Sequence, residues 1–115
     1  MPYVKIQTNW DLSGERQRTL SKKLSETVAT ALGKSQQYVM TALETGVEMN
    51  LGGTDDPMVY VEFKSLGLQT SQTGELSHKL CAFFEEEIHV KQDRIYIVFD
   101  SPAPALWGWN GKTFG

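Results

Sequence analysis

Cysteine is almost absent from this chain of 115 residues, because Cys81 is the only one. A single thiol excludes a disulfide within the chain, and it excludes metal or redox sites built from paired cysteines. Cys81 stands beside an apolar helix stripe, so we expect a buried thiol rather than a nucleophile. The two histidines, His78 and His89, have no partner ligands at a matching spacing, so no metal site is expected. No serine–histidine–acid signature supports hydrolase chemistry.

The sequence also lacks an excess of basic residues and a long apolar run. It has 11 Lys and Arg against 14 Asp and Glu, for a net charge of −3. This balance argues against a nucleic-acid partner, since phosphate binding needs a basic surface. No run approaches the roughly 20 apolar residues of a membrane helix. The first residues do not resemble a secretory signal. We therefore expect a cytoplasmic protein with no membrane partner.

The residues that are present form two copies of one strand–helix–strand unit. Residues 2–6 and 57–61 alternate apolar and polar side chains, as strands do. After each of these strands, apolar residues recur every four positions and form one helix stripe. The stripes are Leu20, Leu24, Val28 and Leu32, then Leu76, Leu80, Phe84 and Ile88. Gly33 is a typical helix end, and residues 38–43 and 95–99 are the expected closing strands.

This order predicts one α+β domain over residues 1–115, with pseudo-repeats at about 2–45 and 57–100 and a C-terminal tail at 101–115. Two such units give a two-layer structure, in which both helices cover one face of a four-stranded sheet. The other face would carry the apolar side chains of Tyr3, Met58, Tyr60, Tyr96 and Val98. Because these are too apolar for a solvated face, we expect a closed oligomer that packs sheet against sheet.

Met1-Pro2 is the first candidate for chemistry. Removal of Met1 would leave Pro2 with a free secondary amine, and an α-amino group titrates near neutrality, at about 7.7–8.0. Apolar surroundings lower an amine pKa further, which suits a general base. The alternative is that this dipeptide has no chemical role, as in many proteins.

The other candidates also have structural explanations. Lys34 is either a cation beside the negative end of a helix or a clamp for a carboxylate. Tyr96 is either a packed strand aromatic or a site residue, and Lys64 is either solvated or near a site. The tail is expected to be ordered, because Trp107, Trp109 and Phe114 need somewhere to bury.

Several short motifs stand in a fixed order along nearly the whole chain. They are Met1-Pro2, Gly33-Lys34 with Gln37-Tyr38, Gly52-Gly53, Ser65-Leu66-Gly67, Asp93-Arg94-Ile95-Tyr96-Ile97, Gly108-Trp109-Asn110 and Thr113-Phe114. Together these motifs closely resemble macrophage migration inhibitory factor and its dopachrome tautomerase relatives.

The resemblance implies a homotrimer in which the sheets surround a central channel, in a barrel-like assembly, with tautomerase sites between subunits. It implies that Pro2 is the catalytic base and that Lys34 pairs with the substrate carboxylate. Tyr96 would come from the adjacent subunit. The remaining implied site residues are Leu66, through its backbone N–H, Ser65 and Lys64 beside it, and Tyr3, Trp107, Trp109 and Phe114 as an aromatic slot. The substrates would be small aromatic 2-keto acids, such as phenylpyruvate-like compounds, and dopachrome-like compounds, with no cofactor.

Four positions depart from the family pattern. Val98 replaces an asparagine, so one hydrogen bond to the ligand would be lost. Met58 and Val61 replace a Cys-x-x-Cys pair, so thiol oxidoreductase activity is not expected. Lys64 adds positive charge near the pocket mouth, which favours dianionic substrates.

Two other functions remain open at this stage. The resemblance also implies a signalling protein that binds a receptor and leaves the cell by a non-classical route, with incidental enzyme activity. Hydration or dehalogenation of an unsaturated acid is a third hypothesis, but the extra arginine and glutamate groups that such enzymes need could not be placed.

Overall fold

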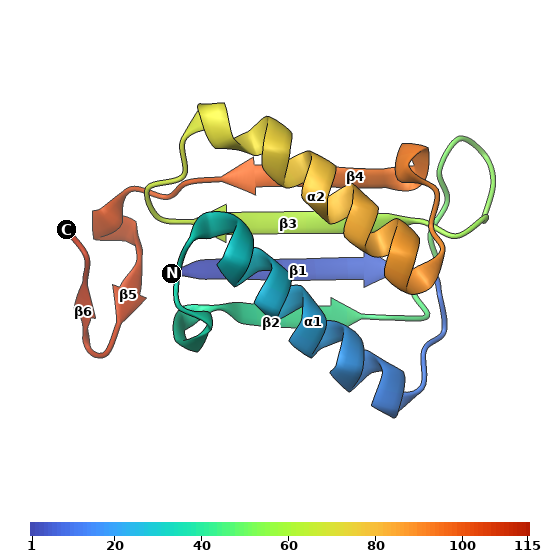
Figure 1. Ribbon diagram of the computed structural model, residues 1–115, viewed down its shortest axis with the longest axis horizontal. Coiled ribbons are helices and arrows are strands. Elements are labelled where there is room, and N and C mark those ends of the chain that lie inside the picture. The colour runs from blue at the N-terminus through green and yellow to red at the C-terminus, as the bar shows by residue number, and fades with distance from the viewer.

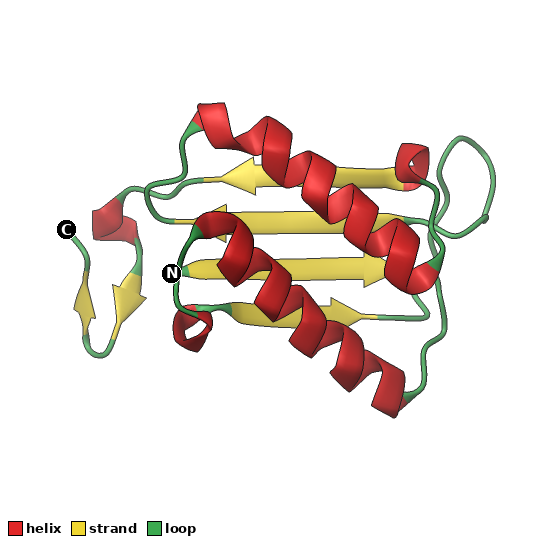
Figure 2. Ribbon diagram, in the orientation of Figure 1, coloured by secondary structure: helices red, strands yellow, loops and turns green.

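Four strands form one mixed sheet, and both long helices lie against the same face of it (Figures 1 and 2). The computed structural model describes residues 1–115. The strands are β1 (Pro2–Thr8), β2 (Met40–Glu44), β3 (Val59–Ser65) and β4 (Ile95–Asp100). The helices are α1 (Gly14–Leu32) and α2 (Thr70–Ile88). Neither helix combines the length and apolarity that a membrane crossing requires.

The sheet order is β2-β1-β3-β4, so each half of the chain contributes one outer and one inner strand. Within each half the two strands are parallel, β1 with β2 and β3 with β4. The halves join through the antiparallel pair of β1 and β3, which runs from Pro2 opposite Ser65 to Thr8 opposite Val59. The predicted tandem βαβ fold is confirmed, and the trimeric assembly stays a prediction.

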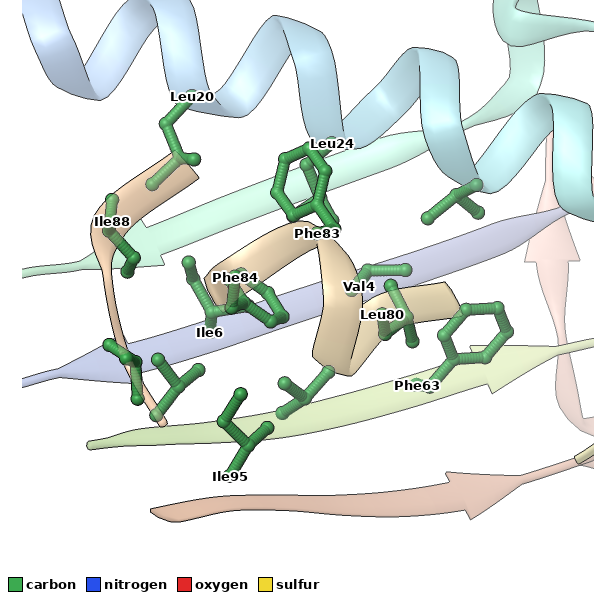
Figure 3. Close-up of a cluster of buried hydrophobic side chains, with 14 of the residues drawn as sticks. Val4, Ile6, Leu20, Leu24, Phe63, Leu80, Phe83, Phe84, Ile88 and Ile95 are labelled. Atoms are coloured by element: carbon green, nitrogen blue, oxygen red, sulfur yellow. The ribbon is translucent and has the colours of Figure 1, made fainter. Parts of the chain in front are cut away.

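The core lies between the sheet and the helices. Alternate residues of β1 and β3 are buried on this side, beginning with Pro2 and ending with Ser65. The predicted stripes face them, and every member except the half-buried Leu32 is buried. Figure 3 shows Leu24 of α1 and Phe84 of α2 among strand side chains such as Ile6. Burying each such side chain contributes about 1.5–3 kcal/mol.

Local hydrogen bonds explain where the observed strands differ from the predicted ones. β3 begins at Val59 rather than at Pro57, because Pro57 has no N–H and the N–H of Met58 donates to Oδ1 of Asn9 at 2.9 Å. The residues before β2 form a 3₁₀ turn (Gln36–Tyr38), in which Oγ of Ser35 accepts from the N–H of Gln37. Tyr38 therefore lies in a turn and not in the closing strand.

The open sheet face is more polar than the sequence analysis predicted. Met58 is only 3% exposed, so it does not contribute to this face as expected. Tyr3 and Tyr60 are half-buried. Charged residues share the face, since Lys5 lies opposite Glu62 and forms a 3.0 Å ion pair with Glu44.

The tail forms a small hairpin at the end of the sheet where β1 begins (Figure 1). It consists of a 3₁₀ turn (Pro104–Leu106) followed by β5 (Gly108–Trp109) and β6 (Lys112–Thr113). The tail is ordered as predicted, but its aromatics are less buried than predicted. Trp107 is half-buried, whereas Trp109 and Phe114 are 51% and 43% exposed.

Candidate functional site at the start of β1

A groove of about 780 Å³ opens at the end of the sheet where β1 begins. This volume is in the range of small-molecule sites. We call it the Pro2 groove. Its lining residues come from the N-terminus, the segment before β2, β3 and the tail, and they are Met1, Pro2, Tyr3, Gln37, Tyr38, Val39, Met40, Lys64, Pro102, Leu106, Trp107, Gly108 and Trp109.

Pro2 is fixed at the inner end of this groove by the sheet. It stands opposite Ser65 in the β1–β3 register, and its side chain is fully buried. In the chain with Met1 present, the Pro2 nitrogen belongs to a peptide bond and has no basic lone pair. Loss of Met1 would convert the same atom into a secondary amine at the groove.

Lys34 reaches this position from the end of α1. Gly33 ends the helix in the left-handed conformation with φ of 62°, and Lys34 follows it directly. The Lys34 ammonium donates to Oγ of Ser65 at 3.4 Å and to the carbonyl oxygen of Leu66 at 3.2 Å. The structure thus brings together Lys34, Ser65 and Leu66 beside Pro2.

The electrostatics of this corner depress amine basicity. Burial lowers the pKa of the Met1 α-amino group below its ordinary value, and the neighbouring Lys34 ammonium lowers it further. Both causes disfavour the charged form of an amine. Pro2 follows Met1 directly and is buried in the same corner of the structure.

Aromatic side chains form one wall of the groove. The rings of Tyr38 and Trp109 meet edge to face with centroids 5.9 Å apart. Behind Trp109, Phe114 stacks at 6.2 Å with an angle of 7° between the ring planes. Tyr3, Trp107 and Trp109 line the groove as expected, whereas Phe114 does not line it and stacks on Trp109.

Tyr96 and Val98 do not meet Pro2 within one chain. Tyr96 pairs with Tyr60, which pairs with Gln7, so it lies near the end of the sheet opposite Pro2. Five strand residues separate these ends, a distance of about 17 Å. Val98 is 52% exposed on the open face. A site that unites these residues with Pro2 therefore requires a second chain.

Tyr96 borders a second groove of about 740 Å³, together with Arg94 and the loop before β3. The Arg94 guanidinium is half-buried and donates to four loop carbonyl oxygens, at distances between 3.0 and 3.3 Å. The acceptors belong to Leu51, Thr54, Asp56 and Pro57. This contact fixes the loop beside the start of β4.

The sequence analysis did not predict as site residues several residues that line the Pro2 groove, namely Gln37, Tyr38, Val39, Met40, Pro102, Leu106 and Gly108. Tyr38 belongs to the Gln37-Tyr38 motif, which could have marked it as a site residue. No sequence pattern marked Met40 and Leu106, because their positions at the groove depend on the turn before β2 and on the fold of the tail.

No group of three or more His, Cys, Asp or Glu side chains is placed to hold a metal ion.

Comparison with known proteins shows which family this chain belongs to. The profile of macrophage migration inhibitory factor (MIF) matches residues 1–115. The chain belongs to the macrophage migration inhibitory factor family. It is 35% identical to a homologue from Brugia malayi over the full length of both chains. It is 34% identical to D-dopachrome decarboxylase-B from Xenopus laevis, over 98% of this chain and 97% of that one.

A solved structure of a family member agrees in fold. The macrophage migration inhibitory factor homologue from Prochlorococcus marinus superposes with a TM-score of 0.90 at 41% identity, and the match covers 98% of this chain and 99% of that one. Identity at this level supports the assignment to the family as well as the fold.

This chain lacks the pair of cysteines that was expected for the family. Met58 and Val61, which occupy the expected cysteine positions, are both buried. The single thiol, Cys81, lies half-buried on α2, and burial raises its pKa. A thiol with a raised pKa is a poor nucleophile at neutral pH.

Proposed function

We propose that this protein is a keto–enol tautomerase acting on phenylpyruvate-like and dopachrome-like compounds, with the Pro2 amine as general base after loss of Met1. The observation that carries the proposal is the position of Pro2, which is buried at the inner end of an aromatic-walled groove with the Lys34 ammonium beside it. Membership of the family supports it, as does the 34% identity to D-dopachrome decarboxylase-B from Xenopus laevis.

The chemistry follows from these positions. The neutral Pro2 amine takes a proton from the carbon next to the keto group, and the C–H pair becomes the C=C bond of the enol. The π electron pair of the carbonyl group moves to its oxygen, which then receives one proton from the protonated Pro2 amine. An amine whose pKa is lowered toward the working pH can both accept and return this proton.

The neighbouring groups hold the substrate during this transfer. Lys34 pairs with the substrate carboxylate, and the Leu66 backbone N–H holds a polar group of the ligand. The aromatic slot, formed by Tyr3, Trp107 and Trp109 with Phe114 behind, takes a phenyl ring. Tyr96 and Val98 reach the site from a neighbouring subunit of a homotrimer, which is consistent with their distance from Pro2 within one chain.

The test is phenylpyruvate tautomerisation by protein whose mass shows the loss of Met1, beside a sample that retains Met1. We expect activity in the processed protein alone. Pro2→Gly in the processed protein should remove most activity without changing the mass of the oligomer in light scattering. An unchanged rate in Pro2→Gly would refute Pro2 as the base.

A receptor-binding protein is the second candidate. It is favoured by the family assignment and by two apolar side chains at the groove, Met40 and Leu106, which are 65% and 80% exposed in one chain. This role would require a cytoplasmic protein to leave the cell by a non-classical route. Saturable binding to a receptor protein that persists when the Pro2 groove is chemically blocked would support it, and the absence of binding would exclude it.

A further inference from the structure

The Pro2 groove has an unusual charge distribution for a site that would bind a compound with one carboxylate. Among its thirteen lining residues, Lys64 has the only charged side chain, and no acidic residue lines the groove. Lys34 is not one of the lining residues, but it adds a second cation at the edge of the groove, because its ammonium contacts Ser65 and Leu66 and neighbours the amino group of Met1, which lines the groove. Two cations therefore border one mostly apolar space.

Neither lysine is neutralised by an acidic side chain. The three salt bridges of the structure involve Lys5, Lys23 and Lys79. Lys64 lies between Tyr3 of β1 and Asp100 of β4 in the sheet register, yet it forms no ion pair with Asp100. Its charge is therefore available to a ligand in the groove.

The two cations approach the site from opposite sides of the sheet. Successive strand residues point to opposite faces. Ser65 is buried on the helix side, where it accepts from Lys34, and Lys64 is exposed on the open side. One carboxylate at Lys34 therefore leaves the charge of Lys64 unmatched, whereas a ligand with two separated carboxylates can match both.

We infer that Lys64 is a specificity-determining residue, and that the groove prefers 2-keto acids with a second carboxylate remote from the keto group. The carboxylate beside the keto group pairs with Lys34, and the remote carboxylate pairs with Lys64. This inference deepens the proposed function and rests on it for the identity of the reacting groups.

The test compares phenylpyruvate with 4-carboxyphenylpyruvate, which differs by one carboxylate on the ring. The measured quantity is kcat/KM for the dianion divided by kcat/KM for the monoanion. We expect Lys64→Gln to lower this ratio about two- to fivefold, toward the upper end of the range for loss of an exposed ion pair. Lys64→Arg should retain most of the ratio. Raising the ionic strength should lower the ratio in the wild type and much less in Lys64→Gln.

Lys22→Gln is the matched control, because Lys22 is exposed on α1 and the substitution changes the net charge equally. It should leave the ratio unchanged. An unchanged ratio in Lys64→Gln, or a fall as large in Lys22→Gln, would overturn the inference.

Binding of 4-carboxyphenylacetate and phenylacetate, measured by calorimetry, separates this inference from the proposed function. Neither compound has a keto group. If the protein turns over neither keto acid, the proposed function fails, and the binding comparison still reports on Lys64. Tighter binding of the dianion that is lost in Lys64→Gln supports the inference, and equal binding of the two compounds refutes it.

Discussion

The ammonium of Lys34 lies 3.2 Å from the carbonyl oxygen of Leu66, and this contact joins the end of α1 to the residue that follows β3. It brings a cation from the first half of the chain to the end of a strand from the second half, beside Pro2. Gly33 makes the approach feasible, because its left-handed conformation turns the chain sharply before Lys34.

Lys34 should shift the pH dependence of activity. Its charge contributes, after burial as the larger cause, to the lowered pKa of the Met1 α-amino group, and we expect the same influence on the Pro2 amine once Met1 is lost. A base must be neutral to accept a proton, so activity is present above the amine pKa and lost below it. Lys34→Gln should therefore move the acidic limb of the kcat/KM profile to higher pH.

The same substitution should also weaken binding of the carboxylate, with kcat/KM for phenylpyruvate falling about tenfold or more. Lys34→Arg, which keeps the charge, should leave the acidic limb nearly in place. Coincident profiles for the wild type and Lys34→Gln would show that Lys34 does not act on the base.

Arg94 should be the main support of the loop before β3. Arg94→Ala removes donors from four carbonyl oxygens, and we expect a loss of about 2–3 kcal/mol in the free energy of unfolding. Arg94→Lys should recover only part of this, because an ammonium lacks the planar fork of a guanidinium.

Urea denaturation at one fixed protein concentration measures this difference. Arg18→Ala is the control, since Arg18 is exposed on α1 and the structure shows no hydrogen bond from its side chain. Equal midpoints for Arg94→Ala and Arg18→Ala would contradict the supporting role.

Helix stripes and strand alternation predicted most of the fold, because these patterns record which faces are buried. The strand ends were less predictable, since they depend on side-chain hydrogen bonds such as that from Met58 to Asn9. Pro2 and Lys34 were candidates from their own chemistry, whereas residues such as Leu66 were predicted as site residues only from the resemblance to a known family. Leu106 could not be found, because its contact with the groove depends on how the tail folds back.

Trp109 and Phe114 should differ in importance. Trp109 lines the groove, whereas Phe114 is not among the lining residues and stacks on Trp109. We expect Trp109→Ala to raise KM for phenylpyruvate about tenfold and Phe114→Ala about threefold, in line with the worth of an aromatic contact. Trp10→Ala is the control, because Trp10 lies outside the groove. Equal effects of the two tail substitutions would show that Phe114 contacts the substrate directly.

Val98→Asn should improve recognition of ring-hydroxylated substrates. Val98 is 52% exposed on the open face of one chain, so it takes no part in the core between the sheet and the helices. One added hydrogen bond should raise kcat/KM for 4-hydroxyphenylpyruvate about two- to tenfold relative to phenylpyruvate. Val98→Thr is the control for side-chain shape, because threonine has nearly the same shape as valine. No gain for the hydroxylated substrate in Val98→Asn would place residue 98 outside the site.

The doubled unit has a consequence for its two prolines. Pro57 is the counterpart of Pro2 in the second repeat, and each proline borders a groove of similar size. Pro57 is linked to Asp56 on its amino side, so processing at the N-terminus can free only the nitrogen of Pro2. Pro57 has a structural role, since its carbonyl oxygen accepts a hydrogen bond from Arg94.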